Sequence, residues 1–297
     1  MTSLTHEFTE TLAASRENVF RALTDEAELG RWFAQRVEIE PRDGGEFRFW
    51  GKHTHGAPAR AQSSQKILRI EAPSLLAFSW RLEDRDSEVT LELTPDPKAA
   101  DGATTVVKGR HYFPVAPDVP RPLDLIDDLW RMTFANLRAH LAGGSGVCLA
   151  DFSDPRPRLR QTILINASRE EVFRTLLDPA LLDKWIAAGA TVEPHVDGRY
   201  SYGWKYDVRG RHVEGGPTRI LELVEDTKLV TDWPNWRGDP EMPAQKITWL
   251  LEAIGDQTRV TLIHDPFERT ADLSDYPQGW MEFLGRLKVQ AETISLG

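Results

Sequence analysis

The sequence predicts an α+β protein made of two tandem copies of one domain, each a curved antiparallel sheet of about seven strands with a long C-terminal helix. The stretch ASRENVFRALTD at 14–25 returns as ASREEVFRTLLD at 167–178, with nine of twelve residues identical. In each copy, strand-like runs precede a final amphipathic helical pattern. The chain has 297 residues, which is enough for two ordinary domains.

The repeat extends far beyond this stretch. Equivalent residues keep an offset of 153 up to the last strand-like run, and a small gap precedes the last helix. A period of this length indicates duplication of a whole domain, not a solenoid. The equivalent pairs are Trp32 and Trp185, Gly45 and Gly198, Phe47 and Tyr200, Phe49 and Tyr202, His111 and His264, and, after the gap, Trp130 and Trp280.

A linker separates the copies. Residues 142–158, AGGSGVCLADFSDPRPR, are rich in Gly, Ser, Asp and Pro and show no periodicity. We therefore expect a first, more divergent domain over 1–143, a linker over 144–156 and a second domain over 157–297.

The second copy shows the elements most clearly. Ser168 is a good N-cap, and Glu170 and Glu171 complement the helix dipole in the first turn. Asp178-Pro179 ends this first short helix and begins a second one. We expect strands over 156–166, 190–194, 198–208, 211–224, 228–233, 244–254 and 258–265, and a long helix over 276–294.

Composition excludes several classes of function. The net charge is −10, and no run of four basic residues occurs, so we expect no nucleic-acid partner. No apolar run approaches the roughly 20 residues that span a bilayer, and the N-terminus lacks a secretory signal. The single cysteine allows no internal disulfide. We expect a cytoplasmic protein with no membrane partner.

The motifs of the second copy resemble a known family. The runs NASREEVFRTLLDP, VEPHVDGRY, TRVTLIHDPF and GWMEFLGRLK are similar to the heat-shock protein 90 ATPase activator-like branch of the START/SRPBCC superfamily. This resemblance covers nearly the whole chain, twice. It implies the helix-grip fold of birch-pollen allergens. Separately, the arginine-rich composition is consistent with a bacterial origin. Members commonly hold a cavity under the last helix, but their functions differ widely.

Aromatic side chains are the best candidates for ligand contacts. Tyr200, Tyr202, Trp204 and Tyr206 alternate along 198–208 and would share one strand face. They either fill the core or line a cavity, since Tyr and Trp carry polar atoms that a dry core must satisfy. The predicted ligand-binding residues are Tyr200, Tyr202, Trp204, Trp233, Trp249, His264 and Trp280 in the second copy, and Phe47, Phe49, Trp80, His111 and Trp130 in the first.

Catalytic and metal-binding motifs are scarce. His264 and His111 lie in phase with inward-facing residues, so each is a weak candidate general base or a structural histidine. His53 and His55 form half a metal site at most, or a solvated loop. The sequence has no phosphate loop, zinc-binding helix or nucleophile elbow, so we expect no cofactor and no metal.

Three functions fit these observations. The first is binding or sequestration of an apolar or aromatic small molecule under the C-terminal helix, such as a polyketide-type natural product, including antibiotic self-resistance. The resemblance implies the version in which the protein sequesters an antibiotic for self-resistance, because an enediyne-resistance protein belongs to the same branch of the fold. The second is a polyketide cyclase or hydrolase that uses a cavity histidine. The third is co-regulation of a chaperone ATPase. Two copies in one chain also predict an intrachain pseudo-dimer.

Overall fold

The structure is a computed structural model that describes residues 2–99, 103–115, 119–239 and 242–295. Within these ranges no helix is long and apolar enough to cross a membrane.

Packing divides the chain into two compact units. Unit 1 comprises residues 1–155 together with 270–278, and unit 2 comprises 156–269 together with 279–297. The predicted domain limits and the predicted linker stay predictions, because a compact unit defined by its internal contacts is not the same as a segment that folds on its own.

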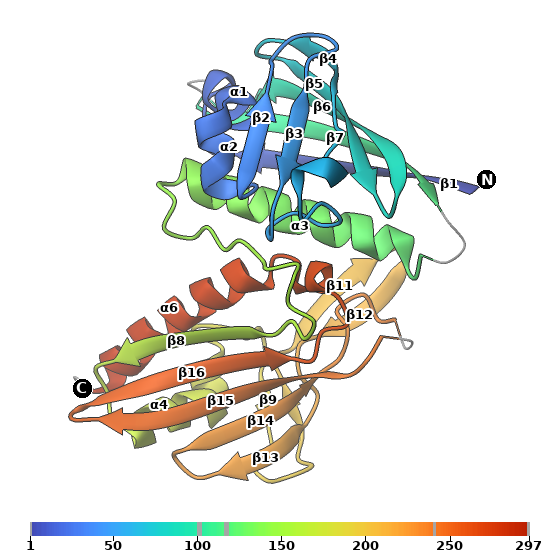
Figure 1. Ribbon diagram of the computed structural model, residues 1–297. Coiled ribbons are helices and arrows are strands. Elements are labelled where there is room, and N and C mark those ends of the chain that lie inside the picture. Colours follow the sequence, from blue (N-terminus) through green and yellow to red (C-terminus); the bar gives the residue numbers. More distant parts are fainter. Residues whose placement is uncertain (1, 100–102, 116–118, 240–241, 296–297) are drawn as a thin grey trace. The chain divides into compact units, whose positions relative to one another are not determined.

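Unit 1 is a five-stranded antiparallel sheet with the order β1-β7-β6-β5-β4. The hairpin β2-β3 joins it through a bridge between Glu46 and Lys66. Helix α3 runs along one face of this curved sheet (Figure 1). The elements are β1 (Thr2–Leu12), α1 (Arg16–Thr24), α2 (Glu26–Trp32), β2 (Arg36–Ile39), β3 (Phe47–Trp50), η1 (Arg60–Gln62), β4 (Ile67–Glu71), β5 (Leu75–Leu82), β6 (Arg85–Pro95), β7 (Thr105–Val115) and α3 (Pro122–Leu141).

Unit 2 repeats this plan with the strand order β13-β14-β15-β16-β8. Two hairpins, β9-β10 and β11-β12, take the place of β2-β3. Helices α4 and α5 follow the first strand, and α6 ends the chain. The elements are β8 (Leu159–Ile165), α4 (Arg169–Leu177), α5 (Pro179–Leu182), β9 (Thr191–Val192), β10 (Tyr200–Ser201), β11 (Trp204–Val208), β12 (Arg211–Gly215), β13 (Ile220–Val224), β14 (Lys228–Trp233), β15 (Gln245–Ile254), β16 (Gln257–Asp265) and α6 (Tyr276–Ser295). The short helix η2 (Thr270–Leu273) and the first three residues of α6 fall in unit 1.

The paired short helices begin as the sequence predicts. Ser168 Oγ accepts a hydrogen bond from the Glu171 amide at 3.2 Å, and the Glu171 carboxylate accepts one from the Ser168 amide at 2.9 Å. This reciprocal pair is a capping box. In unit 1, Ser15 caps α1 by accepting from the Asn18 amide at 3.3 Å. Asp178 then ends α4 and caps α5.

Two of the predicted strands are wrong as continuous elements. The run 198–208 is broken between β10 and β11, and the run 211–224 is broken between β12 and β13. The first break follows from Gly203, whose φ is +71° and where a Cβ would lie 2.6 Å from the carbonyl oxygens of Ala188 and Gly189. Tyr206 therefore lies beyond a kink and does not extend one flat face from Tyr200.

One steric constraint recurs in both copies. A Cβ on Gly45 would lie 2.2 Å from the Glu40 carbonyl oxygen, and a Cβ on Gly198 would lie 2.2 Å from that of Glu193. Only glycine fits such a close backbone approach. The same turn therefore precedes β3 in unit 1 and β10 in unit 2.

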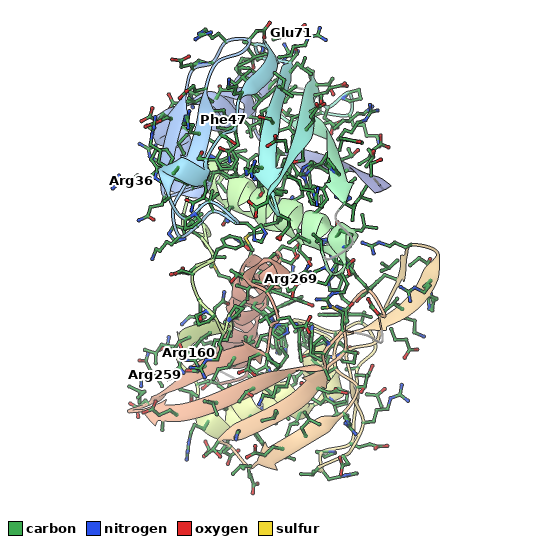
Figure 2. The ribbon with its side chains drawn as sticks, turned by 45° about the vertical axis from the view of Figure 1, so that its right-hand side comes forward. Arg36, Phe47, Glu71, Arg160, Arg259 and Arg269 are labelled. Carbon is green, nitrogen blue, oxygen red and sulfur yellow. The ribbon has the colours of Figure 1, made fainter. Side chains whose placement is uncertain are left out.

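Apolar side chains gather between sheet and helix in each unit. Figure 2 shows Phe47 inside unit 1, while Arg160 and Arg259 lie on the outer side of the unit 2 sheet. This alternation is typical of an antiparallel sheet with one buried face. The architecture confirms the predicted α+β class with two helix-grip domains.

Residues 270–278 belong to unit 1 although they follow β16. Ala271 is fully buried and packs in the apolar core of unit 1. Arg131 Nη1 on α3 lies 3.4 Å from Asp275 Oδ2. Gln278 Nε2 donates to Asn136 Oδ1 on α3 at 2.8 Å. Helix η2 and the first three residues of α6 are therefore part of the structure of unit 1.

Candidate functional site

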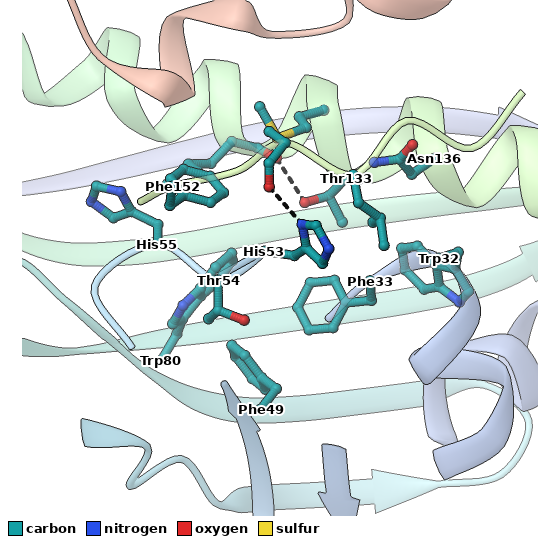
Figure 3. Close-up of a pocket in the computed structure, with 14 residues that line it drawn as sticks. Trp32, Phe33, Phe49, His53, Thr54, His55, Trp80, Thr133, Asn136 and Phe152 are labelled. Carbon is teal, nitrogen blue, oxygen red and sulfur yellow. Dashed lines mark hydrogen bonds between the residues drawn. The ribbon is translucent and has the colours of Figure 1, made fainter. Parts of the chain in front are cut away.

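A small cavity lies beneath α3 in unit 1. Its volume is about 30 Å³, enough for one or two water molecules. Figure 3 shows its aromatic walls and the loop that carries His53, Thr54 and His55. The lining residues are Trp32, Phe33, Phe49, His53, Thr54, His55, Trp80, Leu129, Met132, Thr133, Asn136, Leu149, Ala150 and Phe152.

The Trp80 side chain, on β5, packs against other rings on several sides. Its ring stacks on His111 with a centroid distance of 5.7 Å and an interplanar angle of 5°. Trp130 and Phe49 meet it edge-on at 5.5 and 5.7 Å. The side chain is only 4% exposed, and its Nε1 has no hydrogen-bond partner among the described residues.

Thr54 supplies a second polar atom of the same kind. It sits in a turn between β3 and η1, where its amide donates to the Gly51 carbonyl at 3.0 Å. The residue is 6% exposed, and within the described part of the chain its Oγ1 has no partner. Thr54 and Trp80 both line the cavity and are labelled in Figure 3.

One side of the cavity is formed by residues 148–152, which we call the closing segment. The Asn136 side chain on α3 accepts from the Cys148 amide at 2.8 Å and donates to the Cys148 carbonyl at 3.2 Å. His53 Nδ1 lies 2.9 Å from the Ala150 carbonyl oxygen. The Phe152 amide donates to the Lys52 carbonyl at 2.7 Å. The segment is thus tied both to α3 and to the turn that carries Thr54.

Buried histidines occupy equivalent positions in the two units. Trp130 Nε1 donates to His111 Nδ1 at 3.0 Å, and Trp280 Nε1 donates to His264 Nδ1 at 3.2 Å. Because an indole nitrogen only donates, each Nδ1 accepts and each Nε2 carries the proton. Nε2 of His111 lies 2.7 Å from Ser87 Oγ, and Nε2 of His264 lies 2.9 Å from Gln245 Oε1.

These contacts restrict what the histidines can do chemically. Burial lowers the pKa of both imidazoles to about 3. Both ring nitrogens of each histidine are engaged in hydrogen bonds, so neither presents a free lone pair to a substrate. The arrangement couples the last helix of each unit to its sheet.

The structure brings the predicted residues of unit 1 together. Phe49 and Trp80 line the cavity, and His111 and Trp130 form a second layer against Trp80. Phe47 lies beside Phe49 with ring centroids 5.2 Å apart and does not line the cavity.

The predicted residues of unit 2 form one continuous aromatic cluster. Successive ring centroids are 5.6 Å apart from Tyr200 to Tyr202, 5.0 Å on to Trp204, 6.2 Å on to Trp233 and 5.2 Å on to Trp280. Trp249 meets Trp280 edge-on at 5.9 Å.

Most polar atoms of this cluster are satisfied. Tyr200 Oη donates to the Leu176 carbonyl at 2.7 Å, and Trp204 Nε1 donates to the Ile186 carbonyl at 2.8 Å. Burial raises the pKa of Tyr200 and of Tyr202 well above the usual tyrosine range. Trp249 Nε1 is buried and finds no partner in the described ranges.

Sequence reasoning missed the closing segment. Residues 148–152 lie in the stretch that was predicted as a linker because of its flanking Gly, Ser, Asp and Pro residues. A lone aromatic, Phe152, inside this polar stretch was the available signal. Its ring meets the His55 ring edge-on at 5.4 Å.

His53 and His55 lie in an irregular turn rather than a strand. His55 Nε2 lies 2.6 Å from Glu83 Oε1, and His53 holds the closing segment. Among the residues that the structure describes, no group of three His, Cys, Asp or Glu side chains is arranged to hold a metal ion.

The solved structures that are similar to this chain include the following three. CalU16 from Micromonospora echinospora is 26% identical, with 47% of this chain and 76% of that chain covered and a TM-score of 0.36. DynU16, from the dynemicin biosynthetic locus, is 15% identical over 97% of this chain and 98% of its own, with a TM-score of 0.39. The Aha1 dimer from Colwellia psychrerythraea is 23% identical over 46% of this chain and 96% of its own, with a TM-score of 0.37.

The family comparison covers most of the chain. A search of curated proteins found no match. The family model described as "Activator of Hsp90 ATPase homolog 1-like protein" matches twice, at residues 13–142 and 166–292. The two matches confirm the predicted tandem duplication and the predicted resemblance. The chain therefore belongs to the Activator of Hsp90 ATPase homolog 1-like family, with two copies of the family domain in one polypeptide.

Proposed function

We propose that this protein binds an apolar or aromatic small molecule beneath the long helix of its helix-grip domain. The observation that carries this proposal is the cavity of unit 1, where Phe33, Phe49 and Trp80 face the apolar side of α3. Ligand sites are typically apolar with a few polar groups, and this cavity has that composition. The aromatic cluster of unit 2 is the proposed counterpart under α6.

The finer proposal concerns the ligand and the outcome of binding. A polyketide-type natural product has the flat, largely apolar shape that aromatic walls accept. Binding without turnover would sequester such a compound, and self-resistance to an antibiotic is one use of sequestration. We propose a cytoplasmic location on the sequence grounds given above. The pairing of the two copies as a pseudo-dimer stays a prediction.

The geometry gives less support to the alternative functions. A cyclase or hydrolase that uses His111 or His264 as a base needs an imidazole nitrogen that is open to substrate. Both nitrogens are already hydrogen-bonded, and the lowered pKa makes each imidazole a poor base near neutral pH. Chaperone co-regulation rests on the family membership and on no specific feature of the site.

Titration of the full-length protein with isopropenylnaphthalene tests the proposal. The indole N–H resonances of the ten tryptophans report on both units. Binding beneath α3 should shift the resonances of Trp32 and Trp80, whereas Trp50 on the outer face of β3 serves as an internal control. Unchanged indole resonances at saturating probe would argue against ligand binding in either unit.

A further inference from the structure

Within the described chain, two residues that line the unit 1 cavity carry buried polar atoms without a partner. Trp80 Nε1 and Thr54 Oγ1 are buried and lack partners among the described residues. A buried donor without a partner costs about 1–3 kcal/mol. An occupant that accepts hydrogen bonds from both atoms removes that cost, so these two atoms indicate what the site takes.

The remaining walls restrict the shape of the occupant. Phe33 and Phe49 meet edge-on at 4.8 Å, and Leu129 and Met132 of α3 complete an apolar surround. An apolar surround whose lining residues carry these two donor atoms suits an aromatic molecule that carries a single acceptor oxygen. A hydrocarbon of the same shape would leave both donors unsatisfied.

The closing segment controls access to this place. The present volume of about 30 Å³ holds water but no aromatic ring. One side of the cavity is formed by Leu149, Ala150 and Phe152. Within the described part of unit 1, the closing segment is hydrogen-bonded to α3 and to the 51–56 turn rather than to the strands of the sheet. A ligand therefore enters by displacing residues 148–152 rather than by moving the sheet.

From these observations we infer that unit 1 selects an aromatic ligand with a single acceptor oxygen, such as an aryl ketone. Trp80 Nε1 and Thr54 Oγ1 donate to this oxygen, and residues 148–152 open to admit the ligand and close over it. The inference rests on the proposed function and adds to it the chemical class of ligand and the route of entry.

A matched pair of probes tests the selectivity. Acetylnaphthalene carries a carbonyl oxygen where isopropenylnaphthalene carries a methylene group of similar size. Calorimetry on the full-length protein, with the Trp80 indole resonance to locate binding, should show the ketone binding about tenfold more tightly at this site. Resonance assignment uses Trp80→Phe.

Variants then assign the preference to the two donors. Thr54→Val keeps the shape of the side chain and removes the hydroxyl, so the ketone preference should fall to about threefold. Thr54→Ser keeps the hydroxyl and should retain most of the preference. The double variant Thr54→Val with Trp80→Phe should bind both probes equally. Trp50→Phe, which alters a tryptophan outside the cavity, is the matched control.

Phe152→Ala tests the route of entry. Because this change loosens the closing segment, the ketone should both enter and leave severalfold faster with its preference over the hydrocarbon unchanged.

Equal affinity for the two probes in the wild type would overturn the two-donor site and leave it as a site for water only, while the proposed function would stand. Unchanged rates in Phe152→Ala would overturn the route of entry. Failure of both probes to bind would instead overturn the proposed function itself.

Discussion

Single residues decide how each helix is joined to its sheet. Trp130 and Trp280 each donate to a buried histidine, and Ser87 and Gln245 complete the two networks. The sequence predicted that His111 and His264 point inward, because they are in phase with Val107 and Leu262. It could not predict their partners, because those come from the last helix of each unit and from neighbouring strands, whose packing and register are set only on folding.

The buried imidazoles predict an acid-sensitive fold. The pKa of each histidine is about 3 when folded against 6.5 as the ordinary value. Because the unfolded state binds more protons between these values, the free energy of unfolding falls as the pH drops from about 6.5 towards 3. The expected slope is at most about 1.4 kcal/mol per pH unit for each histidine. Urea unfolding of His111→Gln across this window should show a shallower dependence than the wild type.

A surface histidine provides the control for this experiment. His195 is exposed in a turn of unit 2, so His195→Gln removes one imidazole and leaves the hydrogen bonds of His111 intact, which makes it the matched control. An identical slope in wild type and His111→Gln would contradict the buried neutral state of His111.

At the scale of elements, the order of helices and most strands followed from local patterns. The N-cap Ser168, the Asp178-Pro179 stop and the long amphipathic helix were all predicted correctly. The broken strand at Gly203 was not, because the break depends on backbone oxygens at 188 and 189 that approach from elsewhere. Alternating aromatics on either side of a glycine are compatible with one strand or two.

The duplicated helix start offers a controlled comparison. Glu171 closes the capping box on α4, while Asn18, its equivalent on α1, makes no such contact in the described structure. We expect Glu171→Ala to lower the free energy of unfolding by about 0.5–1 kcal/mol. Asn18→Ala should change it by less than half of that in chemical denaturation. Equal losses would show that the box adds nothing to the serine cap.

The closing segment depends on one amide side chain. Asn136→Leu removes both hydrogen bonds to Cys148 and leaves the Cys148 amide and carbonyl without them, which should destabilise unit 1 by about 1–3 kcal/mol. Hydrogen exchange at residues 148 and 152 should accelerate most. Gln278→Leu removes the third contact of Asn136 and a longer one, at 3.5 Å, to the Gly146 carbonyl, but keeps both hydrogen bonds between Asn136 and Cys148. It should therefore leave exchange at residue 148 much closer to the wild type. Similar exchange in both variants would contradict the role given to Asn136.

At the scale of the whole molecule, the sequence predicted two copies of one fold and their order. It did not predict that residues 270–278 pack in unit 1, since they carry no pattern that distinguishes them from an ordinary loop before a helix. Aromatic faces predicted part of the unit 1 cavity, yet the turn with Thr54 and the closing segment lie in stretches without periodicity. Local patterns report on regular elements and not on the irregular segments between them.

The contribution of residues 270–278 can be measured directly. Ala271→Asp places a carboxylate in the apolar core of unit 1 and should lower its free energy of unfolding by about 3 kcal/mol or more. Hydrogen exchange should show lost protection in α3 and β5, with the strands β8 and β15 far less affected. Val289→Asp, at an exposed position of α6, is the control. Loss of protection confined to unit 2 would refute the assignment of this segment.

The place of residues 270–278 also bears on how the protein is made. During synthesis these residues leave the ribosome after every strand of unit 2 has been translated. Until then, the surface of α3 that packs against Ala271 in the finished protein stays uncovered. The N-terminal copy therefore emerges first but is completed almost last, and a stalled or truncated chain would present an unfinished first unit to the cell's quality-control machinery.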